Sequence, residues 1–278
     1  LNHPMPPLPA APVSARIVEY EQTLPEHHAG TVDTAVLEAI ERLVPRPVSW
    51  SMETGCGKTT ILLSNLSERH VVFAIDDRAW ARSSVRYYEE CPASRRDRIT
   101  LVPGPTQRTL PGHRFEQPID VALLDGPHAY PCPELEYYWV YPHLRPGGML
   151  IVDDIHIPTI RRLHAFLAED EMFELVHVER MTSFFRRTMA PTFRPDRDGW
   201  EHQRFNKARF PEMPGAEDWM ARTARAEAAR AGESIAALEA RVVDLTREVD
   251  WWKHVADQRR LKRRLSRRLG PLARWLVR

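Results

Sequence analysis

Two stretches of this chain decide its fold, Leu124-Asp125-Gly126-Pro127-His128 and Gly147-Gly148-Met149-Leu150-Ile151-Val152-Asp153-Asp154. Each is an apolar run that ends abruptly in carboxylates, which is typical of a buried strand in a parallel sheet. Neighbouring parallel strands end at one crevice, and ligands bind there. We therefore predict that the carboxylates of Asp125, Asp153 and Asp154 converge with the imidazole of His128.

Such a group of side chains suits two kinds of chemistry. Carboxylate oxygens are ligands for a hard divalent cation such as Mg²⁺, and a neutral imidazole can take a proton. A single aspartate at a strand end can instead cap the next turn. Because successive side chains of a strand diverge, Asp154 can face away, which favours Asp125 and Asp153 as ligands. His156 is an alternative to His128 as the base.

A regular alternation of strand and helix patterns surrounds these stretches and predicts an α/β fold. We expect a doubly wound, mostly parallel, seven-stranded Rossmann-like sheet that ends in an antiparallel closing pair within residues 173–189. The expected strands are 48–54, 71–75, 99–102, 120–124 and 148–153. The expected helices are 32–44, 58–67, a stretch in the eighties, 133–142 and 159–168.

Length and composition bound the remaining possibilities. The chain has 278 residues, enough for one full domain and an appendage, and its apolar runs are too short to span a membrane. Residues 1–29 predict a flexible proline-rich lead without the pattern of a signal peptide, so we expect a cytoplasmic location. The three cysteines have no CxxC spacing, which argues against a disulfide framework and a zinc site.

The C-terminal region has a different character from the domain over residues 30–190. Residues 191–215 predict an irregular linker, and residues 216–257 carry apolar positions at steps of three and four, which favours a coiled coil and a homo-oligomer. Residues 258–278 hold nine Arg and Lys and no acid, so residues 1–257 carry a net charge of −8. We expect this amphipathic tail to contact anionic membrane surfaces rather than a specific nucleic acid. The alternatives are a lone helix packed on the domain and a tail that is merely solvated.

A glycine turn follows the first predicted strand, in the sequence Glu53-Thr54-Gly55-Cys56-Gly57-Lys58-Thr59. Glycines let the backbone approach a ligand, and the free N–H groups of the following helix attract its polar groups. A phosphate-binding loop would need glycine where Met52 stands, and a dinucleotide site would need it at Thr60. Both of these sites are therefore disfavoured. An acid that ends the second strand, Asp76, can accept the two hydroxyls of a ribose.

The glycine turn and Asp76 resemble those of class I S-adenosylmethionine-dependent methyltransferases. The later stretches, Leu-Asp-Gly-x-His and Pro-Gly-Gly-x-x-Ile-x-Asp-Asp, resemble the metal-dependent small-molecule O-methyltransferases, including those that act on macrolide sugars. The resemblance covers residues 30–190. It implies that S-adenosylmethionine binds at a site formed by Glu53, Gly55, Gly57, Thr59 and Asp76. It also implies that Asp125, Asp153 and Asp154 hold a cation such as Mg²⁺ and that His128, with Asp125, is catalytic.

The leading hypothesis is therefore methyl transfer to a hydroxyl of a small molecule or sugar, with the acceptor itself left open. One alternative is a catalytically inactive methyltransferase-like scaffold that acts through its coiled coil and basic tail. Another keeps the fold but uses a different cofactor. The intact set of acids and histidine speaks against the scaffold.

Overall fold

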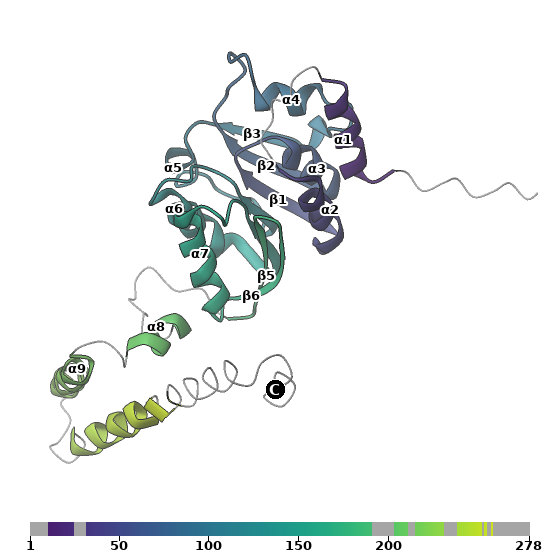
Figure 1. Ribbon diagram of the computed structural model, residues 1–278. Coiled ribbons are helices and arrows are strands. Elements are labelled where there is room, and N and C mark those ends of the chain that lie inside the picture. Colours follow the sequence, from purple (N-terminus) through teal and green to yellow (C-terminus); the bar gives the residue numbers. More distant parts are fainter. Residues whose placement is uncertain are drawn as a thin grey trace, which may run out of the picture. The chain divides into compact units, whose positions relative to one another are not determined.

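The computed structural model describes residues 11–24, 32–190, 203–210, 215–230, 238–251, 253–254 and 257, and the chain divides into two compact units, Leu1–Phe193 and Arg194–Arg278. The first unit contains one sheet with helices packed around it (Figure 1). The sheet has seven strands in the order β3-β2-β1-β4-β5-β7-β6. Its strands are β1 (Val48–Thr54), β2 (Ser67–Ala74), β3 (Ile99–Pro103), β4 (Ile119–Leu124), β5 (Leu144–Val152), β6 (Phe173–Glu179) and β7 (Thr182–Arg187).

The five strands β1 to β5 are parallel, and the hairpin of β6 and β7 joins β5 antiparallel. The prediction of a mostly parallel seven-stranded sheet with an antiparallel closing edge is therefore confirmed. A strand buried on both faces must be apolar at successive positions, and β4 shows this over Val121–Leu124. Val121 and Leu123 pack into one core layer, and Ala122 and Leu124 pack into the other.

Helices cover both faces of the sheet. Helices α1 to α4 contribute Ile17, Ile40, Ile61 and Val85 to one core layer, and α6 and α7 contribute Val140 and Leu163 to the other. The helices of this unit are α1 (Val13–Gln22), α2 (Thr34–Leu43), α3 (Lys58–Leu66), α4 (Ser84–Glu90), α5 (Thr106–Thr109), α6 (Cys132–Val140) and α7 (Pro158–Glu169), with 3₁₀ turns at Arg96–Arg98 and Tyr141–His143.

Helix α1 corrects part of the predicted flexible lead. The lead was predicted over residues 1–29, but residues 13–22 are helical, and Ile17 is fully buried. The amino end of α1 is held by Glu41 of α2, whose carboxylate accepts from Val13 N (2.9 Å) and from Ser14 Oγ (2.7 Å). The proline-rich composition hides this helix because its anchors lie in the next helix, not in its own sequence. Residues 1–10 and 25–31 lie outside the described residues.

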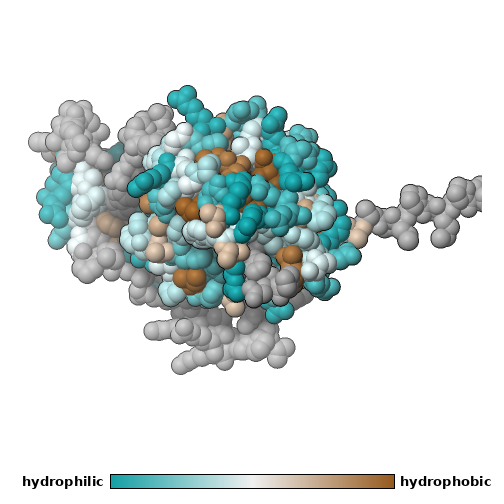
Figure 2. Space-filling model, turned by 90° about the horizontal axis from the view of Figure 1, so that it is seen from above, coloured by the Kyte–Doolittle hydropathy of each residue, from teal (hydrophilic) through white to brown (hydrophobic). Residues whose placement is uncertain are grey.

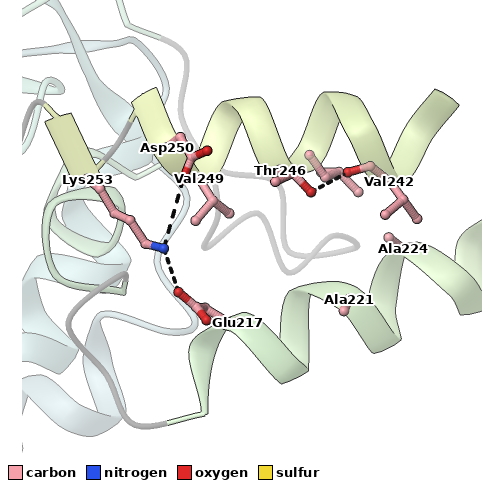
Figure 3. Close-up of a pocket in the computed structure, with 9 residues that line it drawn as sticks. Glu217, Ala221, Ala224, Val242, Thr246, Val249, Asp250 and Lys253 are labelled. Atoms are coloured by element: carbon pink, nitrogen blue, oxygen red, sulfur yellow. Dashed lines mark hydrogen bonds and ion pairs between the residues drawn. The ribbon is translucent and has the colours of Figure 1, made fainter. Parts of the chain in front are cut away.

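The second unit contains α8 (Arg204–Arg209), α9 (Ala216–Arg230) and helical residues within 238–257. The predicted seam residues Ala221 and Ala224 of α9 line one pocket with Val242 and Val249 of the later helical stretch (Figure 3). Lys253 Nζ of the later stretch also lies 2.6 Å from Glu217 Oε1 of α9. These apolar positions thus meet within one chain, and a coiled coil between chains is not shown. The predicted linker over 191–215 is described only from 203 to 210 and at 215, and the basic tail over 258–278 lies outside the described residues.

The surface is mixed in character. The face in Figure 2 is largely hydrophilic, with small, separate hydrophobic areas. Within the part of the chain that the structure describes, none of the helices has the length and apolar character that crossing a membrane requires.

Candidate functional site

The candidate site lies at the carboxyl ends of β1, β4 and β5. The strand order reverses between β1 and β4, and an open α/β sheet binds its ligands at such a reversal. Thr54, Leu124 and Val152 are in register across these three strands, so the residues that follow them share one edge of the sheet. That edge carries Gly55, Asp125 and Asp153.

Gly55 and Asp125 touch each other at this edge. Gly55 has a φ of +80°, and a Cβ built on it would lie 2.3 Å from the backbone oxygen of Asp125. A side chain at this position would therefore meet both left-handed strain and a clash with the neighbouring loop. The glycine turn and the loop that carries Asp125 form one packed unit.

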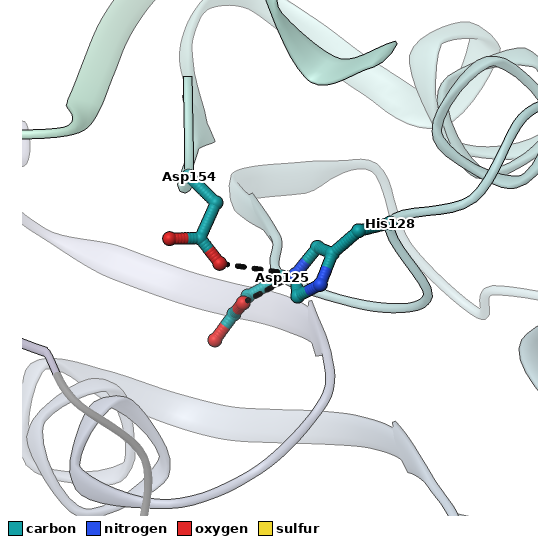
Figure 4. Close-up of side chains that lie close together, drawn as sticks. All are labelled: Asp125, His128 and Asp154. Atoms are coloured by element: carbon teal, nitrogen blue, oxygen red, sulfur yellow. Dashed lines mark ion pairs between the residues drawn. The ribbon is translucent and has the colours of Figure 1, made fainter. Parts of the chain in front are cut away.

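Three of the predicted site residues come together in a cluster, Asp125, His128 and Asp154, which Figure 4 shows. His128 Nε2 lies 3.1 Å from Asp154 Oδ2 and 3.6 Å from Asp125 Oδ1. The imidazole thus faces a carboxylate from each of two strand ends. His156, the alternative base, has its Nδ1 3.5 Å from the other oxygen of Asp154 and is more exposed than His128.

The two adjacent aspartates after β5 have different surroundings. Strand β5 ends at Val152, and Asp154 has a φ of +56°, a left-handed conformation that turns its carboxylate toward His128. The Asp153 carboxylate instead accepts a hydrogen bond from the Thr182 hydroxyl of β7. Sequence reasoning favoured Asp153 over Asp154, but the alternation of side chains on which it relied stops where the strand stops.

The acidic groups of this edge perturb one another. Burial raises the pKa of Asp125 to about 7, a value to which the negative charges of Asp153 and Asp154 also contribute and which the hydrogen bond with His128 opposes. Burial also raises the pKa of Asp153. The hydrogen bond with Asp125 raises the pKa of His128, and the charge of Asp154 adds to that increase. The site therefore favours positive charge.

A divalent cation fits the donors of this cluster. One ligand atom from each of Asp125, His128 and Asp154 lies within 4.8 Å of the other two. His128 Nε2 is buried, and the carboxylate oxygens of Asp154 and Asp125 beside it can bind the same cation. Two carboxylates and an imidazole are ligands that Mg²⁺ or Mn²⁺ accept.

Glu53 lies beneath the glycine turn. It is fully buried, and its carboxylate accepts hydrogen bonds from the hydroxyls of Thr59 (2.6 Å) and Thr60, while His70 Nε2 lies 3.2 Å away. Thr60 Oγ1 also accepts from Gly57 N at 2.9 Å. Glu53 and Thr59 therefore hold the turn and the start of α3 in place, and a direct cofactor contact by either one stays a prediction.

Two acids follow β2, and their environments separate their roles. Asp76 is exposed, and its carboxylate accepts from Arg78 Nη1 at 2.6 Å. Asp77 is buried and accepts from Ser83 Oγ and from the backbone N–H groups of Ser84 (2.7 Å) and Val85 (3.1 Å). Asp77 thus caps α4, whereas Asp76 keeps a carboxylate accessible at the site.

Sequence reasoning missed one buried acid of this edge. Glu136 of α6 is 2% exposed, and it accepts hydrogen bonds from the hydroxyls of Thr54 and Thr106. Burial raises the pKa of Glu136 to about 7. The one available signal was an acid within the apolar and aromatic run Leu135-Glu136-Tyr137-Tyr138-Trp139-Val140.

Comparison with known proteins yields one family and a set of similar structures. The model of a family described as "Methyltransferase domain" matches residues 52–155. No curated protein matches the sequence. The cofactor-bound protein Rv0187 from MTB is 15% identical, with a TM-score of 0.50, over 67% of this chain and 99% of that one. The O-methyltransferase TomG from Streptomyces achromogenes, solved with SAM, is 18% identical, with a TM-score of 0.48, over 65% of this chain and 91% of TomG. An O-methyltransferase from Bacillus cereus, solved with SAH, is 15% identical, with a TM-score of 0.45, over 64% of this chain and 90% of that enzyme.

Proposed function

We propose that this chain, whose residues 52–155 match a methyltransferase-domain family, is a class I S-adenosylmethionine-dependent methyltransferase that methylates a hydroxyl of a small molecule or sugar. The observation that carries the proposal is the convergence of Asp125, His128 and Asp154 beside Gly55, at the reversal of strand order. An acid–histidine group at that edge stands where a bound methyl donor and an acceptor hydroxyl would meet.

In this proposal, His128 removes the proton of the acceptor hydroxyl. The proton would move to an imidazole nitrogen of His128, and the freed oxygen would accept the methyl group of the donor, with S-adenosylhomocysteine as the leaving group. S-adenosylmethionine supplies a methyl group that its sulfonium already activates. The carboxylates of Asp125 and Asp154 stabilise the protonated imidazole, in agreement with the raised pKa of His128.

The binding of the donor is assigned to the glycine turn and to Asp76. Gly55 and Gly57 allow the backbone to approach the amino-acid half of the donor, and Asp76 accepts the ribose hydroxyls. Glu53 and Thr59 support these contacts through the turn that they hold in place. Arg78, which pairs with Asp76, also binds Glu89 through two nitrogens and so fixes the direction of the Asp76 carboxylate.

A cation such as Mg²⁺ would be held by Asp125 and Asp154, with Asp153 or His128 as the further ligand. When bound, it would lower the pKa of the acceptor hydroxyl and orient its oxygen. The two assignments of His128 differ in what they predict. As a ligand, His128 contributes to metal affinity. As a base, it contributes to the turnover rate while the affinity for Mn²⁺ stays the same in a His128→Gln variant.

The test combines donor binding with transfer. Titration calorimetry of the full chain with S-adenosylmethionine is expected to give saturable binding. A panel of sugar, phenol and catechol acceptors with labelled donor is expected to give transfer that Asp125→Asn reduces at least 100-fold. An Asp97→Asn variant is the control. Asp97 is an exposed carboxylate in the 3₁₀ turn before β3, so it lies at the amino end of the parallel strands, away from the candidate site at their carboxyl ends. Absence of donor binding, or full activity of Asp125→Asn, would contradict the proposal.

The remaining functions assigned to the C-terminal region are proposals of the same kind. The exposed Val242 and Val243 leave apolar surface for self-association, and the basic residues 258–278 suit anionic membranes. Light scattering of the chain with and without residues 216–278, and flotation with anionic vesicles, would test them. The inactive scaffold is not favoured. Such a protein would not need Asp125, His128 and Asp154, yet these residues lie together at the reversal of strand order.

A further inference from the structure

Glu136 is a buried carboxylate on the aromatic helix α6, and the chemistry proposed above makes no use of it. Its Oε2 accepts from Thr54 Oγ1 at 2.8 Å, and its Oε1 accepts from Thr106 Oγ1 at 2.6 Å. Within the described chain, no ion pair with lysine or arginine is recorded for it. Burying a carboxylate is unfavourable unless its hydrogen bonds are made, and an apolar side chain would fill this space at lower cost. Its position therefore calls for an explanation beyond packing.

A hydrogen-bond chain links Glu136 to the candidate site. The backbone N–H of Asp125 donates to Thr54 Oγ1 at 3.1 Å. A threonine hydroxyl has one proton, and that of Thr54 goes to Glu136. The carboxylate thus fixes the direction of the Thr54 hydroxyl, and the hydroxyl in turn holds the first residue of the loop 125–128.

Glu136 also packs directly against this loop. A Cβ built on Gly126 would lie 2.0 Å from Glu136 Oε1, so the carboxylate occupies the space that any side chain at position 126 would need. At the other end of the loop, the backbone oxygen of His128 accepts from Thr159 Oγ1 at 2.5 Å. The loop that carries Asp125 and His128 is therefore held at both ends, and Glu136 controls the end at Asp125.

We propose that Glu136 is a positioning residue, which acts through Thr54 and Gly126 to set the placement of the loop that carries Asp125 and His128. This inference rests on the proposed function, because the loop matters for turnover only if Asp125 and His128 act in methyl transfer. A displacement of reacting groups by about 1 Å can cost on the order of 100-fold in rate. Positioning at this level requires a rigid support, which two hydrogen bonds and a close contact provide.

Variants at Thr54 and Glu136 separate positioning from folding. Thr54→Val keeps the shape of the side chain but removes the link to Asp125 N–H. Glu136→Leu removes the carboxylate, whereas Glu136→Gln keeps an oxygen that can accept from Thr54. We expect Thr54→Val and Glu136→Leu to lower kcat at least 10-fold with donor affinity changed less than 3-fold, and Glu136→Gln to recover most of kcat.

Thr188→Val is the matched control. The Thr188 hydroxyl also links a backbone N–H to an acceptor, since it accepts from Ala190 N (3.2 Å) and donates to Glu171 O (2.7 Å). Thr188 follows β7, which runs antiparallel to β5, so it lies at the amino end of the parallel strands and away from the candidate site. It is expected to lower the melting temperature to a comparable extent with kcat unchanged. Wild-type kcat in Thr54→Val, or an equal loss in Thr188→Val, would overturn the inference.

A second measurement does not depend on turnover. The ring-proton NMR signals of His128, in the chain without added metal, are expected to shift in Thr54→Val and Glu136→Leu and to stay in place in Glu136→Gln and Thr188→Val. If the wild type fails to bind S-adenosylmethionine, the proposed function is wrong, and this readout still decides whether Glu136 places the loop. Unchanged His128 signals in all four variants would reject the positioning role.

Discussion

Replacing Glu136 with glutamine is expected to make the protein more resistant to unfolding as the pH rises. Burial raises the pKa of this carboxyl from about 4.5 to about 7, although the nearby charge of His128 opposes the shift. A raised pKa means that the fold favours the protonated acid, so the native state holds a proton that the unfolded chain has released. The group therefore costs the wild type stability as the pH rises from about 4.5, and the loss is complete above about 7.

The magnitude follows from the proton affinity. Each tenfold change in proton affinity corresponds to about 1.4 kcal/mol, so a change in pKa from about 4.5 to about 7 corresponds to about 3 kcal/mol. Most of this, on the order of 2–3 kcal/mol, falls between pH 5 and pH 8. Because the side chain is 2% exposed, solvent screens this effect little. Glutamine stays neutral throughout and can accept the Thr54 hydrogen bond with its oxygen.

The assay is urea unfolding of wild type and Glu136→Gln at pH 5, 6, 7 and 8, with the free energy of unfolding compared at each pH. The difference, variant minus wild type, is expected to grow by on the order of 2–3 kcal/mol over this range with an unchanged m-value. A Glu134→Gln variant, which removes a less buried carboxylate of the same helix, controls for the loss of one negative charge. A difference that is constant with pH would refute the reasoning.

Two further predictions concern the glycine turn and the acids that follow β2. Gly55→Ala is expected to lower the free energy of unfolding by about 2 kcal/mol or more, because the new Cβ would add left-handed strain and lie 2.3 Å from the Asp125 backbone oxygen. Gly112→Ala is the control and should change the free energy little, because its Cβ would meet nothing within 4 Å. Urea unfolding measures both variants. Asp76→Asn is expected to weaken S-adenosylmethionine binding at least 10-fold in calorimetry, with little effect on the free energy of unfolding. Asp77→Asn is expected to leave binding almost unchanged and to lower the free energy of unfolding by about 1–2 kcal/mol, because it weakens the cap of α4. Equal effects of the two aspartate variants on binding would contradict this division.

The sheet was predictable because its information is local. A strand buried on both faces must be apolar at consecutive positions, as in Val121-Ala122-Leu123-Leu124, and the acid that follows marks its end. Parallel strands in register then bring Asp125 and Asp153 to one edge, as residue order alone implied. The place of the candidate site, at the carboxyl ends of the parallel strands, could thus be predicted from the sequence.

The finer geometry was not predictable because it depends on residues distant in the chain. The left-handed turn at Asp154 and the hydroxyl of Thr182 decide which aspartate faces His128, and neither is visible in the run Ile151-Val152-Asp153-Asp154. Helix α1 depends in the same way on Glu41 of another helix. Apolar positions at steps of three and four recur over residues 216–257, but this period alone does not say whether their partner is another chain or α9 of the same chain.

The contrast between Glu53 and Glu136 shows how the same residue type supports the two halves of this edge. Each is a carboxylate with almost no exposed surface, and each accepts from two threonine hydroxyls. Glu53 holds the start of α3 behind the glycine turn, and Glu136 holds the loop that begins at Asp125. Because Gly55 lies against the backbone of Asp125, a shift in either half would displace the other. Under the proposed function, the distance between a bound methyl donor and the acid–histidine cluster would therefore depend on two buried acids that need not touch either substrate.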